Sequence, residues 1–203
     1  MTLSQQDRDR IATAIRTAET KTSGEIVCVL ARTSSDAAAL PVFVASLVAL
    51  AVPWVLIAVT EFSVERILLL QILVFLVLAA LLCLPRVRMA VLPRKVRRAS
   101  AHRAAMEQFV IRGIARKKDR CGILIFVSLA EHYARIIADE GIAARVPQSD
   151  WQAAVDALIV HMRGGSVAEG FLAAIGACEA VLTTHFPRTG AGRDELPDRI
   201  YLI

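Results

Sequence analysis

The amino-acid sequence predicts a mixed α/β sandwich with a two-helix transmembrane hairpin inserted directly after the first strand. Two uncharged apolar runs, residues 38–60 and 67–84, are long enough to cross a bilayer, which takes about 20 residues as a helix. The 155 residues outside the segment 38–85 alternate helical and strand-like patterns, as a single α/β domain does. The chain is 56% hydrophobic but only 5% aromatic, with a mean hydropathy of +0.53. This composition excludes a disordered chain and indicates a part embedded in lipid.

The segment before the hairpin predicts one helix and one strand. Ser4 followed by Asp7 is typical of a helix N-cap, and apolar residues then recur at helical spacing over about four turns. Residues 21–24, Lys-Thr-Ser-Gly, end this helix. Residues 25–31 form a short apolar run rich in β-branched side chains, which indicates a buried strand.

The hairpin itself is predicted from two spans joined by a short charged connection, residues 61–66. A pair of buried helices in a soluble core is the alternative, but neither span has the polar face that such helices usually show. Pro53 lies inside the first span and is expected to kink it, which membrane helices tolerate. The small residues Ala45, Ala49 and Ala58 are expected to let the two spans pack closely.

Positive charge is concentrated directly after the second span. Residues 86–120 carry 12 basic and 2 acidic side chains, although the whole chain has a net charge of only +5. The positive-inside rule places this segment in the cytoplasm. A hairpin returns both ends to one side, so we expect a multi-pass protein with both termini in the cytoplasm. The residues expected to set this orientation and to lie at the membrane surface are Arg86, Arg88, Arg94, Lys95, Arg97 and Arg98.

The same basic residues have a second interpretation, because clusters of Lys and Arg also neutralise the phosphates of nucleic acids. Their position decides between the two. A basic cluster that adjoins a membrane span is typical of a topology signal or of contact with anionic lipid head groups. We therefore expect the lipid bilayer as a partner, together with an unidentified membrane protein, and no nucleic acid.

The segment after the hairpin first predicts a helix and two strands. The basic helix extends from Arg94 to about Lys117, and the most strand-like run of the chain follows at 122–130. A tight turn leads to a returning strand over 133–138. Because helices interleave with strands, strands 24–31 and 122–130 are expected to be parallel and joined by a right-handed crossover that contains the hairpin. The domain is then discontinuous, with residues 1–37 and 86–203 on either side of the hairpin at 38–85.

Two helices are predicted near the C-terminal end. Ser149 with Gln152 and Ser166 with Glu169 have the spacing of capping boxes, and each pair precedes apolar residues at helical spacing. The last residues, 200–203, are expected either to dock as an edge strand or to stay loose.

Three stretches of the chain resemble the TPM domain family: Thr22-Ser23-Gly24-Glu25-Ile26 after an amphipathic helix, the strand 122–129 with its return from Glu131 to Ile137, and Pro147 to Trp151 before a helix. The family is named for a thylakoid lumen protein, a photosystem II assembly protein and an acetylcholine-receptor modulator. The resemblance implies a three-layer α/β/α sandwich. It is to a bacterial branch of membrane proteins, which implies the bacterial inner membrane.

No motif of a common enzyme class is present: the sequence has no GxxxxGK[ST], GxGxxG, HExxH or GxSxG. The four cysteines show no CxxC spacing and are expected to be reduced packing residues. His132, in the predicted turn, is either a general acid or base or a solvated turn residue, and we expect the latter. The sequence therefore assigns no catalytic residue.

Carboxylates at strand ends are the candidate metal ligands. Asp139 and Glu140 follow the returning strand, and Glu25 begins the first strand. Ca²⁺ and Mg²⁺ need several oxygens within about 2.6 Å, so the neighbours Asp139 and Glu140 can hold one cation together only in a loop. In the alternative interpretation, these acidic residues simply end a strand before Gly141.

Two functions of different class follow. The first is a membrane-anchored, cytoplasm-facing domain that binds or organises another membrane component, with no cofactor. The second follows from the resemblance, because members of the family are linked to acid phosphatase activity and divalent-metal binding. It is a phosphatase-like enzyme dependent on a divalent cation such as Ca²⁺ or Mg²⁺, with Asp139, Glu140 or Glu25 as ligands.

Overall fold

The structure is a computed structural model and describes residues 3–34, 39–84, 87, 92–114, 121–188 and 196–203. The chain divides into two compact units. One combines residues 1–34 with 101–203, and the other comprises residues 35–100. Each unit is described by itself below, and we call the first the α/β unit and the second the hairpin unit.

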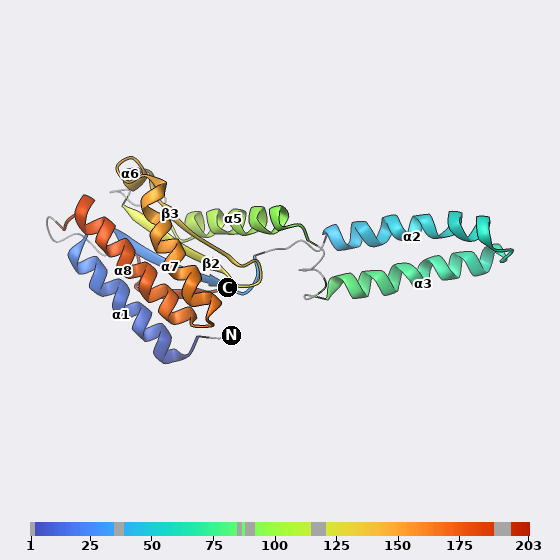
Figure 1. Ribbon diagram of the computed structural model, residues 1–203, viewed down its shortest axis with the longest axis horizontal. Coiled ribbons are helices and arrows are strands. Elements are labelled where there is room, and N and C mark those ends of the chain that lie inside the picture. The colour runs from blue at the N-terminus through green and yellow to red at the C-terminus, as the bar shows by residue number, and fades with distance from the viewer. Residues whose placement is uncertain (1–2, 35–38, 85–86, 88–91, 115–120, 189–195) are drawn as a thin grey trace. The chain divides into compact units, whose positions relative to one another are not determined.

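The α/β unit contains a four-stranded sheet in the order β3-β2-β1-β4 (Figure 1). Its strands are β1 (Glu25–Ala31), β2 (Gly122–Ser128), β3 (Tyr133–Ala138) and β4 (Ile200–Leu202). β1 is parallel to both β2 and β4, whereas β3 runs antiparallel to β2. The parallel pairing of the first two long strands is as predicted. Of the two alternatives for the C-terminal residues, the structure has the edge strand.

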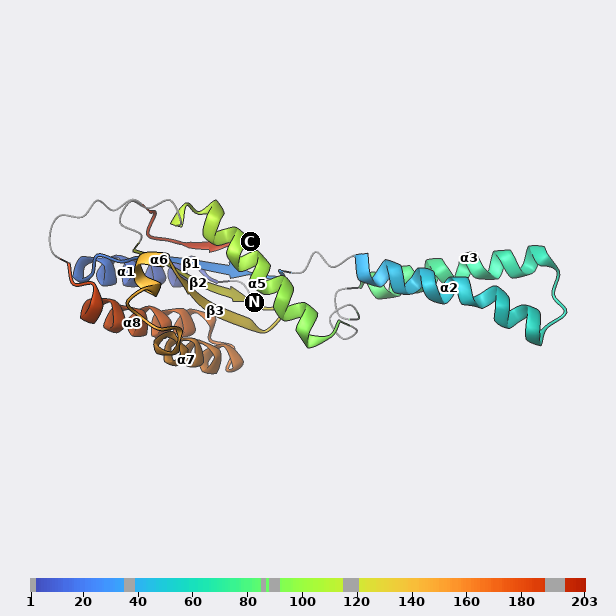
Figure 2. The same ribbon diagram turned by 90° about the horizontal axis from the view of Figure 1, so that it is seen from above.

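The helices of this unit cover both faces of the sheet, and Figure 2 shows them on its two sides. The helices are α1 (Gln5–Lys21), α5 (Arg94–Ile111), α6 (Glu140–Ala143), η2 (Gln148–Trp151), α7 (Gln152–Arg163) and α8 (Val167–His185). α1, α7 and α8 pack on one face, where Ile26, Cys28 and Leu30 of β1 point. The C-terminal half of α5 packs on the other face through Ala105 and Phe109. Strand alternation thus gives two apolar clusters with the sheet between them.

The hairpin unit contains α2 (Ala39–Val59) and α3 (Val64–Cys83), which pack against each other, and also the first seven residues of α5, 94–100. Ala45 and Ala49 are buried in this contact as expected, whereas Ala58 is exposed. The second helix begins at Val64 and not at residue 67, because Ser63 has the extended backbone of an N-cap and Glu65 falls in the first turn. An acidic residue is favourable there because it faces the positive end of the helix dipole.

Three helices of the described chain are long and apolar enough to cross a membrane, judged by length and composition: residues Val42–Val59, Val64–Cys83 and Val167–His185. The third differs from the other two in its surroundings. Eight side chains of α8, including Phe171 and Ile175, are buried in the α/β unit, so its apolar face is accounted for by packing on the sheet.

The N-terminal cap forms as predicted, and the two later capping boxes do not. Ser4 Oγ accepts from the Asp7 amide at 3.1 Å, and the Asp7 carboxylate accepts from Ser4 N at 3.2 Å. The Ser4 hydroxyl also bonds this carboxylate, which lowers the pKa of Asp7. Ser149 instead lies in the 3₁₀ turn η2, since α7 begins only at Gln152. Ser166 precedes α8 without a side-chain cap bond.

The basic helix α5 ends earlier than predicted, at Ile111 instead of near Lys117. Gly113 follows with φ +76°, the left-handed conformation that glycine adopts readily where a helix ends. The predicted residues from 115 to 117 lie outside the described residues. The predicted strand over 122–130 ends at Ser128, because Leu129 and Ala130 enter the turn that leads to β3.

Gly122 is the position in the sheet that is least able to accept a side chain. A Cβ atom there would lie 2.4 Å from Cγ2 of Ile114, a branched side chain buried over β2. We expect Gly122→Ala to lower the free energy of unfolding by about 1–3 kcal/mol through overpacking. The measurement is the unfolding of the detergent-purified full chain followed by circular dichroism.

Gly176→Ala in α8 is the matched control, because no atom lies within 4 Å of its added Cβ. Alanine is preferred to glycine inside a helix, so this variant is expected to be neutral or more stable by up to about 1 kcal/mol. Equal losses of stability in the two variants would contradict the close contact between Gly122 and Ile114.

Candidate functional site

Asp139 lies between β3 and α6, at the edge of the sheet where β1 and β2 begin. Its backbone N–H donates to the Gly122 carbonyl at 2.9 Å, and its Oδ1 accepts from the Glu140 amide at 2.7 Å as the N-cap of α6. The residue is only 7% exposed. Its second oxygen, Oδ2, is buried and has no hydrogen-bond partner among the described residues. A buried carboxylate oxygen without a partner is costly, which makes Asp139 a candidate for binding a cation or proton.

Glu25 begins β1 at the same end of the sheet and is also buried, with 5% exposure. Its register partner is Gly122, the same residue that the Asp139 amide contacts. Strand alternation points both carboxylates to the face that α5 covers, with Gly122 between them. Two strand spacings separate them, or about 10 Å between Cα atoms. The structure therefore places Glu25 and Asp139 at the same end of the strands and on the same face of the sheet.

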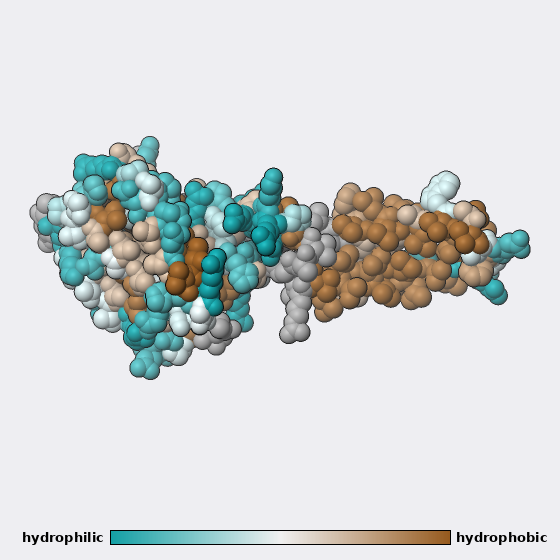
Figure 3. All heavy atoms as spheres, in the orientation of Figure 1, coloured by the Kyte–Doolittle hydropathy of each residue, from teal (hydrophilic) through white to brown (hydrophobic). Residues whose placement is uncertain are grey.

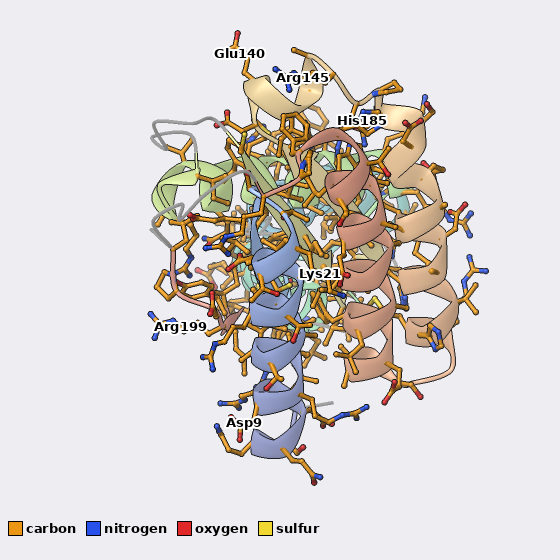
Figure 4. The ribbon with its side chains drawn as sticks, turned by 90° about the vertical axis from the view of Figure 1, so that its left-hand side faces the viewer. Asp9, Lys21, Glu140, Arg145, His185 and Arg199 are labelled. Atoms are coloured by element: carbon orange, nitrogen blue, oxygen red, sulfur yellow. The ribbon has the colours of Figure 1, made fainter. Side chains whose placement is uncertain are left out.

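Glu140 does not join these two carboxylates. It is exposed in the first turn of α6, and Figure 4 shows its side chain pointing away from the unit near Arg145. The short helix separates the surroundings of Asp139 and Glu140 although the residues are neighbours. Within the described residues, no group of three or more His, Cys, Asp or Glu is placed to hold a metal ion.

A second buried carboxylate, Glu131, lies at the opposite end of the sheet, just after β2. It is 5% exposed. Its Oε1 accepts from the Thr33 hydroxyl and from the Ser34 amide, both at 3.1 Å, and its Oε2 also accepts from that amide. The buried Ser128 hydroxyl donates to Oε2 and accepts from Ser34 Oγ at 2.7 Å. Both carboxylate oxygens thus receive hydrogen bonds, as an ionised acid requires.

This polar cluster, composed of Thr33, Ser34, Ser128 and Glu131, joins the segment after β1 to the turn after β2. Backbone bonds reinforce the connection, because Leu129 N donates to the Ala31 carbonyl at 3.0 Å. Glu131 stands out in the sequence only as one of the acidic residues near a strand end, and Thr33, Ser34 and Ser128 are not predicted as site residues. The available signal was that polar residues follow both parallel strands, whose carboxyl ends meet at one edge of the sheet.

The other side chains considered from the sequence show no catalytic arrangement with these carboxylates. His132 is exposed in the turn before β3 with φ 50°. Cys28 and Cys178 are fully buried, and burial raises the pKa of Cys28 well above its usual value and that of Cys178 to about 12. Neither thiol is therefore a thiolate near neutral pH. Both act as packing residues.

The basic residues expected at the membrane surface lie at the start of α5. Arg94, Lys95 and Arg98 are exposed there, and Arg97 is half-buried. Arg86 and Arg88 fall outside the described residues.

Removing the charge of Glu131 tests the polar cluster. We expect Glu131→Gln to lower the free energy of unfolding by about 1–3 kcal/mol, because a neutral amide accepts weaker hydrogen bonds and brings donors toward the Ser34 N–H and the Ser128 O–H. Hydrogen exchange should also become faster at the Ser34 amide. Glu107→Gln, an exposed position in α5, is the control and should change stability by no more than about 0.5 kcal/mol. Unchanged exchange at Ser34 in Glu131→Gln would show that the carboxylate does not hold this segment.

Comparison with known proteins supports the expected relationship. Residues 86–181 match the family model of the TPM domain, so the resemblance predicted from the sequence is confirmed. Among solved structures, the chain is similar to the NMR structure of BA42 protein from the psychrophilic bacterium Bizionia argentinensis. That similarity has a TM-score of 0.63 at 20% identity and covers 100% of this chain and 97% of the other. It shows a shared fold. No curated protein matches the chain at a comparable level.

Proposed function

We propose that this TPM-domain chain is anchored in the bacterial inner membrane by α2 and α3, and that its α/β unit binds or organises another membrane component at the cytoplasmic face. The surface of the hairpin unit is the observation that supports anchoring. Most side chains of its helices α2 and α3 are apolar on the face that Figure 3 shows, and the polar ones gather at the end where the two helices are joined. Trp54 is 79% exposed, Val59 76% and Leu69 68%.

The exposed apolar surface of these helices is more stable in lipid than in water. Monomeric soluble proteins rarely expose contiguous apolar patches larger than a few hundred Å². In α2 and α3 most large apolar side chains are exposed, among them Leu50, Ile57, Leu73 and Val77. Burying such side chains yields about 25 cal/mol for each Å² of apolar surface removed from water. Helices satisfy their interior backbone polar groups themselves, as lipid requires, and membrane helices tolerate a proline such as Pro53 of α2.

The orientation rests on the distribution of charge around the two spans. Near the connection between α2 and α3 the basic residue is Arg66, in the first turn of α3, whereas the start of α5 carries Arg94, Lys95, Arg97 and Arg98. The positive-inside rule assigns the side with more basic residues to the cytoplasm. The parallel pairing of β1 with β2 requires both parts of the α/β unit to lie on one side of the membrane, and the charge distribution supports the cytoplasmic side.

A labelling experiment tests both the anchoring and the orientation. In a Cys83→Ala background, Ser63→Cys should react with a membrane-impermeant maleimide in intact spheroplasts, because residue 63 lies between the two spans. Ser149→Cys, exposed in the α/β unit, should react only after lysis. The chain should also stay in the membrane pellet during an alkaline carbonate wash. Release by carbonate would overturn the anchoring, and labelling of Ser149→Cys in intact spheroplasts would overturn the orientation.

The same reporters test the basic residues. Joint replacement of Arg94, Lys95, Arg97 and Arg98 by Gln should increase the fraction of chains in which Ser149→Cys reacts before lysis. Arg145→Gln with Arg163→Gln is the control, because these arginines lie far along the chain from the spans.

A second candidate function, a phosphatase-like enzyme dependent on a divalent cation, is favoured by one observation. Oδ2 of Asp139 is buried without a described hydrogen-bond partner, and Glu25 shares its edge and face of the sheet. Carboxylate oxygens are the preferred ligands of Ca²⁺ and Mg²⁺. Asp139 and Glu25 would hold the cation, which would supply positive charge for a phosphate group. Glu140, exposed on α6, would at most approach through a bound water.

Calorimetric titration of the detergent-purified chain with Ca²⁺, Mg²⁺ and Mn²⁺ tests this second candidate. If Asp139 and Glu25 bind a cation, Asp139→Asn and Glu25→Gln should each weaken the binding at least tenfold. Glu140→Gln should leave the binding nearly unchanged. Absence of binding at millimolar concentration, or equal binding by all variants, would eliminate this site as the centre of an enzyme.

A further inference from the structure

A cavity of about 360 Å³ lies at the carboxyl ends of β1 and β4, on the face of the sheet that α1 covers. Two arginines, Arg8 and Arg32, line it together with apolar side chains. The apolar lining includes Leu3, Leu30, Leu129 and Leu202. We call this space the arginine cavity. It belongs entirely to the α/β unit.

The fold explains why these side chains meet. Leu30 of β1 and Leu202 of β4 are register partners, so their side chains lie next to each other on one face of the sheet. Arg32 is two residues beyond Leu30, and strand alternation directs it to the same face. α1 contributes Arg8 from its first turns. In open α/β sheets, ligands bind outside the carboxyl ends of the strands, and the arginine cavity has this position.

Arg8 is half-buried and has little within the protein to satisfy it. Its Nε atom is buried without a hydrogen-bond partner in the described part of the chain, and Nη2 reaches the Leu3 carbonyl only at 3.5 Å. Other arginines of α1 are paired, since Arg10 contacts Glu169 at 2.8 Å and Arg16 contacts Asp198 at 3.2 Å. A buried donor without an acceptor costs stability, which indicates a position suited to an anion from outside the chain.

Arg32 contributes the second guanidinium group, and hydrogen bonds to two neighbouring segments hold its backbone in place. Its N–H donates to the Ile203 carbonyl at 2.8 Å, and its carbonyl accepts from Ala130 N at 3.1 Å. No described carboxylate forms an ion pair with Arg32, whose side chain is exposed. Two arginines that line one cavity are suited to a phosphate, because the planar fork of arginine matches phosphate oxygens.

The rest of the lining restricts the chemistry of the ligand. Four leucines and Ile203 make the walls apolar, so the ligand needs an apolar part beside its anionic group. The volume falls in the range of small-molecule sites. An adjacent space of about 290 Å³ shares Leu3 and Leu30 but is lined by Asp7 and Glu169. The carboxylates of Asp7 and Glu169 repel an anion from this adjacent space. An anionic group therefore fits only in the arginine cavity, which has room for one.

We propose that the arginine cavity binds an anionic phospholipid, with the phosphate between Arg8 and Arg32 and the start of the acyl chains against the leucines. This inference rests on the proposed membrane anchoring, because it draws the ligand from the bilayer that α2 and α3 would enter. Chain connectivity supports a lipid source. Arg32 precedes Ala39, the first residue of α2, by seven positions.

Binding of short-chain lipids to the full chain in a neutral detergent tests the proposal without a bilayer. The probes are dihexanoyl phosphatidylglycerol, dihexanoyl phosphatidylcholine and inorganic phosphate, each titrated by calorimetry. We expect the anionic lipid to bind at least tenfold more tightly than the other two. Arg8→Gln and Arg32→Gln should each weaken this binding roughly tenfold to a hundredfold, as loss of a charge-assisted hydrogen bond does.

Arg163→Gln is the matched control, because Arg163 is exposed at the end of α7 and does not line the cavity. It removes the same charge and should leave the dissociation constant unchanged. Circular dichroism of each variant shows whether it is folded. If Arg8→Gln does not fold, Arg8→Lys replaces it and should still bind more weakly, since lysine lacks the planar fork.

Three results would overturn the proposal: equal binding of the two lipids, binding of inorganic phosphate as tight as that of the anionic lipid, or equal losses in Arg163→Gln and the cavity variants. The second result would assign the site to free phosphate. The proposed anchoring fails separately, through release by carbonate, and that result leaves the calorimetric measurement valid.

Discussion

The parallel pairing of β1 with β2 is the constraint on which the rest of the structure depends. Seven residues of β1 lie in register with seven of β2, although residues 32–121 separate the two strands in the sequence. Parallel neighbours need a crossover connection, and here that connection contains the whole hairpin unit. The chain must therefore leave the sheet after Ala31 and return before Gly122 on the same side of any membrane that it enters. An even number of spans satisfies this condition and an odd number does not.

Both ends of this parallel pair carry buried carboxylates, but the two ends are built differently. At the carboxyl end, the oxygens of Glu131 accept hydrogen bonds from Thr33, Ser34 and Ser128. That carboxylate fixes the path of the chain where it leaves β1. At the amino end, Asp139 caps α6 with one oxygen while the other is buried without a described donor. A satisfied carboxylate stabilises a loop, whereas an unsatisfied buried one calls for an explanation such as a bound ion or water. The proposed cation site therefore uses the carboxylate at the amino end.

Much of the fold could be predicted from the sequence because local signals and burial agree there. The apolar runs of β1 and β2, the Ser4 cap and the helical pair all have strong local patterns. The predicted capping box at Ser149 does not form, because Pro147 and the buried Trp151 favour a 3₁₀ turn. Burial of the Trp151 side chain stabilises the fold more than one capping hydrogen bond would. The site was less predictable. Glu131 and Thr33 are 98 positions apart, and only the register of the strands brings them together. The sequence predicts Asp139 as a candidate ligand because it is acidic and follows a strand. Its burial could not be predicted, because it depends on where β3 ends and α6 begins.

The arginines of α1 show how the same residue type can serve structure or binding. Arg10 and Arg16 are exposed and have carboxylate partners, and an exposed pair such as Arg10–Glu169 contributes roughly 0–1 kcal/mol. Arg8 is on the same helix but is turned toward the carboxyl ends of the strands, where its Nε atom is buried. Folding gains nothing from an unsatisfied guanidinium in that place. Leucine or methionine would cover Leu3 and Leu30 without the cost of desolvation. An anionic ligand that completes the proposed site would supply the acceptor that Arg8 lacks, and every residue involved belongs to the α/β unit.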